Sequence, residues 1–114
     1  MTVPTGPAAL LRIYTHEAAR HGGHPLYEAI VLKAREAGLK GVTVLRGPMG
    51  YGAARHLRNA NIIDLSADLP LVIEIVDAEA DLRAFLPVLE AMKALGLVTL
   101  EKVEVLHAGG SAPV

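Results

Sequence analysis

The chain has 114 residues, enough for one domain with a core, and its lack of cysteine excludes disulfides and thiolate chemistry. Its hydrophobic fraction is 52%. Its formal net charge is −1, whereas a general nucleic-acid binder needs a broad basic face, so we expect no nucleic-acid partner. The apolar runs are too short to span a bilayer, so we expect no direct membrane insertion and a cytoplasmic location.

The first half of the chain predicts a strand, a helix and a second strand. Residues 1–8 and 108–114 are predicted to be flexible tails around a single domain over 9–107. A strand predicted over 9–15 leads through a polar loop to a helix over 25–37.

The helix predicted over 25–37 has clear signals at both ends. Pro25 suits the first turn, where its missing N–H has no helical partner in any case. Leu26 and Ile30 begin an apolar stripe with helical spacing, and Gly38 is suited to the position just after the helix.

A positively charged, glycine-rich segment follows a strand predicted over 41–46. No acidic residue occurs between Glu36 and Asp64, and Gly47-Pro48 marks a turn. Glycine lets a backbone approach a ligand and turn its N–H groups toward an anion, and arginine binds phosphate. We therefore predict an anion-binding loop over 47–60 that is mobile without its ligand. The predicted ligand-binding residues are Arg46, Gly47, Gly50, Tyr51, Gly52, Arg55, His56 and Arg58.

Two alternatives remain open for this segment. It could be a solvated surface loop whose arginines face water. Tyr51 could stack on a base, or it could rest on a neighbouring subunit.

The second half repeats the pattern of strand, helix and strand. Residues 59–65 could be a short strand or the returning arm of the loop. A strand is predicted over 71–76, apolar on both faces except for Glu74. The last strand is predicted over 98–107, with a bulge near Lys102 where the alternation slips.

The helix predicted between these two strands has one irregularity. Asp77 is the predicted N-cap, and the apolar spacing continues to Leu95, with Gly96 ending the helix. Pro87 removes one backbone hydrogen bond, so we expect a kink or a break near Arg83.

The order of elements predicts an α+β fold, the ferredoxin-like βαββαβ sandwich, with a long loop between strands 2 and 3. Two helices cover one face of such a sheet. Because the strands carry apolar residues on their second face as well, we predict that the chain forms a homo-oligomer.

The residue types also bear on a metal site and on catalysis. His16, Glu17, His21 and His24 could ligate a metal, but their spacing is irregular and HGGH is too flexible to preset a geometry. The chain shows no recognisable nucleophile motif. We predict no metal site, no cofactor and no catalytic residue, and hence a protein that is not an enzyme.

Three segments resemble one known family: HPLYEAIVLKAREAGLKGVTVLRGPMGYGA, SADLPLVIEIVDAEADLRAFLPVLEAM and GLVTLEKVEVL. Over about residues 9–107 the chain resembles an uncharacterised bacterial family with a PII-like fold, some of whose members are encoded beside, or fused to, fluoride-exporting channels. The resemblance implies a homotrimer, a loop between strands 2 and 3 that contacts partner proteins, and clefts between subunits that bind small effectors, usually adenine nucleotides. The residues that match the loop-base pattern of this family are Arg46, Gly47, Gly50, Tyr51 and Gly52, followed by Arg55 and His56.

The function predicted on this basis is a PII-like regulatory protein in signal transduction. It would bind a small anionic effector, with an adenine nucleotide as the class that the resemblance implies, and contact a partner such as a membrane transporter or channel through the 47–60 loop. The alternatives are an effector-free interaction module that docks a transporter or an enzyme, and a metal-tolerance-type trimer.

Overall fold

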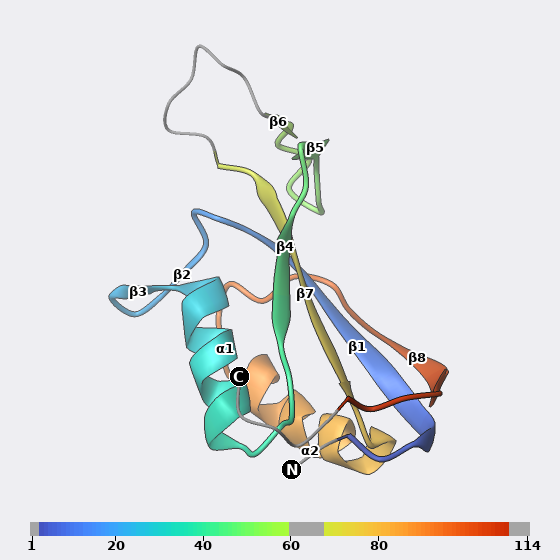
Figure 1. Ribbon diagram of the computed structural model, residues 1–114. Helices are drawn as coiled ribbons and strands as arrows, with labels where there is room; N and C mark the ends of the chain where they lie inside the picture. Colours follow the sequence, from blue (N-terminus) through green and yellow to red (C-terminus); the bar gives the residue numbers. More distant parts are fainter. Residues whose placement is uncertain (1–2, 60–67, 110–114) are drawn as a thin grey trace.

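The computed structural model describes residues 3–59 and 68–109, in which two helices lie on one face of a four-stranded antiparallel sheet (Figure 1). The elements are β1 (Gly6–His16), β2 (Arg20–His21), β3 (His24–Pro25), α1 (Leu26–Glu36), β4 (Thr43–Arg46), β5 (Met49–Gly50), β6 (Arg58–Asn59), β7 (Pro70–Asp77), α2 (Glu79–Glu90) and β8 (Val98–Val105). Neither helix of the described residues has the length and apolar character needed to cross a membrane.

The strand order of the sheet is β4-β7-β1-β8, and each neighbouring pair is antiparallel. This is the order of the ferredoxin-like sandwich, so the predicted α+β fold is confirmed. The long connection also lies where it was predicted, between β4 and β7.

The core lies between the sheet and the helices. Alternate residues of β1 and β7 point toward the helices, because successive side chains of a strand lie on opposite faces. The buried residues that form this core are Ala9, Leu11, Ile13, Ala19, Leu26, Ile30, Ala34, Ile73, Ile75, Leu82, Phe85, Leu89 and Met92.

Each end of α1 lies within one residue of its prediction, although Pro25 precedes the helix rather than belonging to its first turn. Pro25 is the N-cap residue, and Gly38 has a φ of +83°. The N–H of Gly38 donates to the carbonyl of Arg35, and the N–H of Leu39 donates to the carbonyl of Ala34. These two bonds form a Schellman motif, which satisfies two of the last carbonyls of the helix.

The predicted start of α2 was wrong. Its N-cap is Ala78, without a side-chain hydrogen bond, and Asp77 is instead the last residue of β7 and fully buried. The carboxylate of Asp77 accepts hydrogen bonds from the backbone N–H of Lys40 (3.0 Å), from its Nζ (3.1 Å) and from the N–H of Ala78 (2.8 Å). A buried carboxylate with three donors is well satisfied, so Asp77 joins the α1–β4 connection to the start of α2.

The end of α2 also differs from its prediction. The helix includes Pro87 and runs without a break through Arg83, but it stops at Glu90 rather than at Leu95. Gly96 has a different role, because a Cβ there would clash with the carbonyl oxygen of Tyr14. Glycine at this position lets the chain before β8 cross close to β1.

The start of β1 and the regularity of β8 differ from the sequence prediction. β1 begins at Gly6, so residues 6–8 belong to the sheet rather than to the predicted tail. The bulge near Lys102 was wrong, because β1 and β8 pair residue by residue from Gly6 opposite Val105 to Ile13 opposite Val98. The slip in the sequence alternation reflects an exposed charged pair on an otherwise regular strand.

The second face of the sheet combines apolar and charged side chains. Val72 and Val76 of β7 are half-buried on this face. Between them, Glu74 accepts a hydrogen bond from Arg12 Nε at 3.0 Å, and Arg12 NH1 lies 3.7 Å from Glu101. The hydrogen bond to Glu74 raises the pKa of Arg12. The apolar residues predicted for this face are present, with an ion-pair cluster between them.

Candidate functional site at the loop base

Residues 47–59, which belong to the described part of the connection between β4 and β7, lie beyond the sheet, with β5 and β6 at the far end of β4 (Figure 1). At the root of this connection, the N–H of Gly47 donates to the carbonyl of Pro70 (2.8 Å), and the N–H of Glu17 donates to the carbonyl of Leu69 (2.9 Å). A Cβ at Gly47 would lie 3.3 Å from Pro70 Cγ, so glycine allows the two arms to approach. We call this place the loop base, formed by residues 16–18, 46, 47, 58 and 68–70.

Part of the predicted loop is a short antiparallel ribbon. β5 and β6 pair with Met49 opposite Asn59. Beyond them, Arg55 adopts a φ of +60°, and its N–H donates to the carbonyl of Gly52 at 2.8 Å. Strands of two residues give no readable alternation, so the sequence did not predict this ribbon. The mobility of the loop without a ligand stays a prediction.

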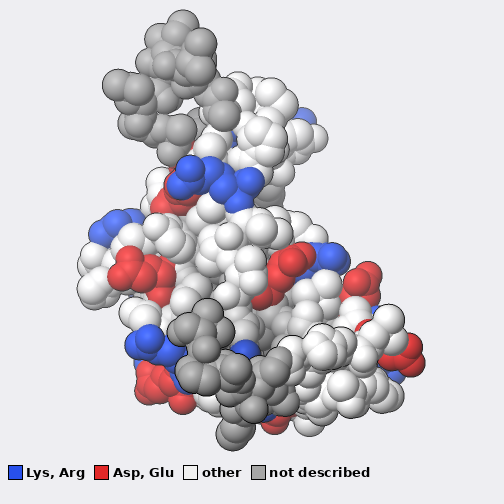
Figure 2. Space-filling view, in the orientation of Figure 1, with Lys and Arg blue, Asp and Glu red and all other residues white. Residues whose placement is uncertain are grey.

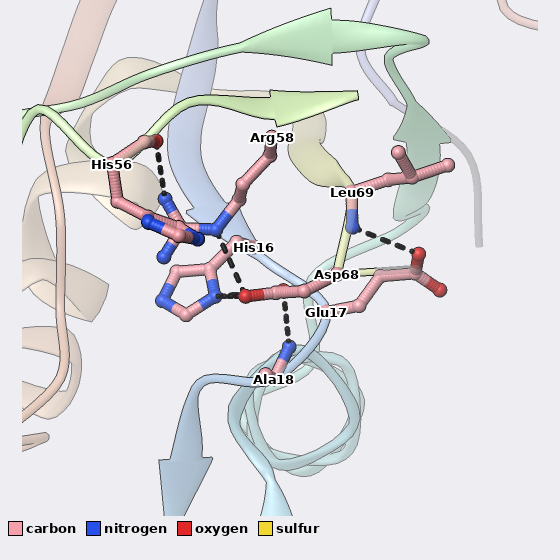
Figure 3. A network of polar contacts seen from close by, with 7 residues as sticks. All are labelled: His16, Glu17, Ala18, His56, Arg58, Asp68 and Leu69. Atoms are coloured by element: carbon pink, nitrogen blue, oxygen red, sulfur yellow. Dashed lines mark hydrogen bonds and ion pairs between the residues drawn. The ribbon is translucent and has the colours of Figure 1, made fainter. Parts of the chain in front are cut away.

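Asp68 is the centre of the polar network at the loop base (Figure 3). Its carboxylate accepts hydrogen bonds from the N–H of Ala18 (2.8 Å) and from Arg58 Nε (2.9 Å), and it lies 2.9 and 3.0 Å from His16 Nδ1. Burial alone would raise the pKa of Asp68, but the bonds from Ala18, His16 and Arg58 together outweigh it and lower the pKa from 3.8 to about 2. Asp68 is therefore a firmly ionised anchor at neutral pH.

Arg58 reaches this anchor from the returning arm of the connection. Its side chain is only 13% exposed, and its NH1 also donates to the carbonyl of His56 at 3.3 Å. The guanidinium of Arg58 is thus engaged within the protein and holds β6 to the end of β1.

Arg46 lies on the outgoing arm and is bound differently. Its side chain is 63% exposed, and its NH2 donates to Glu17 Oε2 at 2.9 Å. The other oxygen of this carboxylate, Oε1, accepts the N–H of Leu69 at 3.2 Å (Figure 3). Figure 2 shows basic and acidic side chains gathered at the narrow part of the molecule, where the connection leaves the sheet.

The structure divides the predicted ligand-binding residues into two groups. Arg46, Gly47 and Arg58 lie at the loop base, and Gly50 lies near it, since a Cβ there would be 3.4 Å from Pro70 Cγ. The remaining residues lie farther along the connection: exposed Tyr51, Gly52, Arg55 and His56.

Sequence reasoning missed the acidic side of the site. The sequence pattern marks Glu17 and His16 only as candidate metal ligands, and it does not single out Asp68. The available signal was the position of Asp68, a carboxylate two residues before a strand that pairs with the strand leading into the basic segment. A sequence alone does not show that the end of β1 supplies the N–H and the histidine that hold it.

The histidine-rich segment does not form a cluster in the structure. His16 contacts Asp68, whereas His21 and His24 are cross-strand partners in the β2–β3 hairpin. Among residues 3–59 and 68–109 there is no group of three or more His, Asp or Glu side chains arranged to hold a metal ion.

A hollow of about 200 Å³ lies away from the loop base, between the end of α1 and α2. It is lined by Ala37, Gly38, Leu39, Asp81, Ala84, Phe85 and Val88. Its lining has one carboxylate and no basic side chain, so it does not suit an anion.

Residues 8–105 match the family described as "DUF190: Uncharacterized ACR, COG1993". The chain belongs to this family. It is 41% identical over 98 residues to a "UPF0166 protein" of Aquifex aeolicus (strain VF5), a match that covers 86% of this chain and 92% of the relative. It is 36% identical over 94 residues to "UPF0166 protein MJ1524" of Methanocaldococcus jannaschii, covering 82% of this chain and 86% of the relative. The family resemblance predicted from the sequence is confirmed.

The fold is similar to that of CPII from Thiomonas intermedia K12. One structure, described as CPII, a nitrogen regulatory PII-like protein bound to ADP, AMP and bicarbonate, has a TM-score of 0.61 and 21% identity, covering 90% of this chain and 92% of that one. A second, described as CPII bound to ADP and bicarbonate, has a TM-score of 0.58 and 23% identity with the same coverage. At these identities the likeness shows the fold alone, which is PII-like.

Proposed function

We propose that this family member is a regulatory protein that binds a small anionic effector, an adenine nucleotide, and contacts a partner protein through the 47–60 connection. It acts as a homotrimer, and the effector site lies in the clefts between subunits, next to the loop base. The partner is a transporter or channel, and the protein itself is not an enzyme. Effector binding orders the connection in one conformation, which the partner reads.

The exposed guanidinium of Arg46 is the observation that carries this proposal. It lies at the root of the connection, at the end of an edge strand, and it is 63% exposed. An arginine in such a place can turn to an incoming phosphate without any change in the fold. The CPII structures, which are described as bound to ADP, support a nucleotide as the ligand class.

The second face of the sheet supports the homotrimer. The half-buried Val72 and Val76 on that face, together with the Arg12–Glu74 pair, offer an apolar surface with a polar centre. A second copy of the chain would remove these side chains from water. Sedimentation should give a trimer at micromolar concentration, and a stable lone protomer would contradict this part of the proposal.

Binding of ADP, measured by isothermal titration calorimetry and by thermal shift, tests the effector site. ADP should raise the melting temperature, because it binds only the folded state. Arg46→Gln should weaken ADP binding about tenfold or more, the effect of losing one charge-assisted bond to phosphate. The matched control is Arg83→Gln, because Arg83 is equally exposed at 61% and is also paired with a glutamate, Glu79, but lies on α2.

Loss of affinity in Arg46→Gln but not in Arg83→Gln would support the site. Equal affinity in both variants would remove Arg46 from it. The absence of any stabilisation by ADP, AMP or ATP would overturn the effector itself. It would favour the effector-free interaction module, for which Met49, Tyr51 and Leu57 offer exposed apolar contacts on the connection.

A further inference from the structure

Glu17 has a fixed position and two different partners. Its backbone N–H is bound to the carbonyl of Leu69 at 2.9 Å, and its Oε1 accepts the N–H of Leu69 at 3.2 Å. Its side chain is 22% exposed. The carboxylate is therefore held in place by Leu69, the residue before β7, and only its second oxygen, Oε2, faces Arg46.

Arg46 is held much more weakly than Glu17. The contact with Glu17 Oε2 runs from NH2 at 2.9 Å, and the arginine side chain is 63% exposed. A guanidinium has five N–H donors in a fork that binds two oxygens of a carboxylate or phosphate best. The arginine is thus free to exchange its partner while the glutamate stays where it is.

We propose that Glu17 is an internal anion that occupies Arg46 and sets the affinity of the loop base for phosphate-bearing ligands. The proposal rests on the effector site proposed above and assigns its regulation. A phosphate that enters the site takes Arg46 from Glu17, and the exchange lowers the observed affinity by the strength of the pair that is broken. A neutral ligand does not compete for Arg46 and is unaffected.

Arg58, the second arginine of the loop base, cannot act in this way. It is 13% exposed, and its partner Asp68 also accepts a bond from Ala18 and contacts His16. Removing Arg58 from Asp68 would uncover a carboxylate that is largely shielded from water. The loop base therefore combines one fixed arginine with one exchangeable arginine, and Glu17 controls the second.

The test is the variant Glu17→Gln. Its amide oxygen can still accept the N–H of Leu69, so the turn is kept while the negative charge is lost. Titration calorimetry at fixed ionic strength should show binding of ADP and AMP that is about three- to fivefold tighter than in the wild type, the size expected for a surface ion pair. Adenosine, which has no phosphate, should bind equally to both proteins.

The matched control is Glu79→Gln, which removes the same charge from a glutamate that is also paired with an exposed arginine, at 2.8 Å on α2. Its ADP affinity should equal that of the wild type. The double variant Glu17→Gln/Arg46→Gln should bind ADP no more tightly than Arg46→Gln alone. A tighter double variant would mean that Glu17 acts by general repulsion and would overturn the inference.

The remaining outcomes separate the two proposals. If the wild type binds ADP and Glu17→Gln binds it with the same affinity, the role of Glu17 is overturned and the effector site stands. If neither protein binds ADP or AMP, the effector site is overturned and the role of Glu17 with it. If only Glu17→Gln binds ADP, the role of Glu17 as an internal competitor is supported, and ADP as the effector of the wild type is overturned.

Discussion

Two aspartates lie at opposite ends of β7, and both accept several hydrogen bonds through their carboxylates, but they connect different parts of the molecule. Asp77, the last residue of the strand, is fully buried and accepts bonds from Lys40 and Ala78. Asp68, two residues before the strand begins, has a side chain that is 26% exposed and accepts bonds from Ala18 and Arg58. One carboxylate lies among the helix ends, and the other lies at the loop base.

The difference lies in what each carboxylate joins. Asp77 connects the α1–β4 turn, whose Leu39 and Val42 pack against the core, to α2, which supplies part of that core. Asp68 connects the end of β1 to Arg58, which lies in the returning arm of the connection. The Asp77 end of β7 therefore stabilises the fold, and the Asp68 end fixes the geometry of the candidate site. Substitutions at the two ends should differ in how much they lower the free energy of unfolding and in how that loss depends on pH.

The largest effect is expected for Asp77→Asn. The neutral amide has one acceptor oxygen instead of two, so one donor of Lys40 loses its partner in the interior. Breaking one side of a buried ion pair costs about 3–5 kcal/mol in the free energy of unfolding. Urea denaturation at neutral pH measures it.

The control for Asp77→Asn is Asp81→Asn. Asp81 lies 3.7 Å from the same Lys40 Nζ but has a side chain that is 56% exposed. An exposed pair is worth about 0–1 kcal/mol, so the control should stay close to the wild type. Equal losses in both variants would show that burial does not distinguish Asp77.

A smaller and pH-dependent effect is expected for Asp68→Asn. A pKa lowered from 3.8 to about 2 corresponds to at most about 2.5 kcal/mol, which screening around a side chain that is 26% exposed reduces to about 1–2 kcal/mol. Because the pKa is lower in the folded state, this stability is complete above pH 3.8 and is lost as the pH falls through about 2. Urea titrations of both proteins from about pH 6 to pH 2 should show the difference shrinking below about pH 4.

The carboxyl resonance of Asp68 gives an independent measurement. Its titration followed by NMR should have a midpoint near 2, well below the ordinary 3.8. A midpoint at the ordinary value would mean that the bonds at the loop base do not persist in solution, and the contrast between the two ends of β7 would then be one of burial alone.

Most of the fold could be predicted from the sequence, because local patterns encode it. The stripe that begins with Leu26 and Ile30, with Gly38 after it, marked α1 to within one residue at each end. The errors fell where tertiary contacts decide. Asp77 is a good N-cap by residue type, but in the structure it is buried and bonded to Lys40. Gly96 has the residue type of a helix stop, but it allows the close approach of the chain to Tyr14.

The candidate site was predicted only in part, for a related reason. The basic, glycine-rich side is continuous in the chain from Arg46 to Arg58 and could be read directly. The acidic side comes from Glu17 and Asp68, which are about 50 residues apart and meet only because β1 and β7 are neighbours. No residue spacing in the sequence predicts this contact, so only the structure shows which carboxylates pair with the arginines.

The smallest effects are expected from the two arginines of the loop base. Arg58→Gln removes one of the bonds to Asp68 from a side chain that is 13% exposed, and should cost about 1 kcal/mol in the free energy of unfolding. Arg46→Gln removes an ion pair whose arginine is 63% exposed, and should change stability by less than about 0.5 kcal/mol. Urea denaturation of both variants in one buffer measures the difference, and Arg83→Gln again serves as the exposed control. If Arg46→Gln proved the more destabilising, the Arg46–Glu17 pair would be needed for the stability of the fold. An arginine with that role could not exchange its partner for a phosphate. The opposite order keeps the division between a fixed and an exchangeable arginine, on which the proposed ligand binding at the loop base depends.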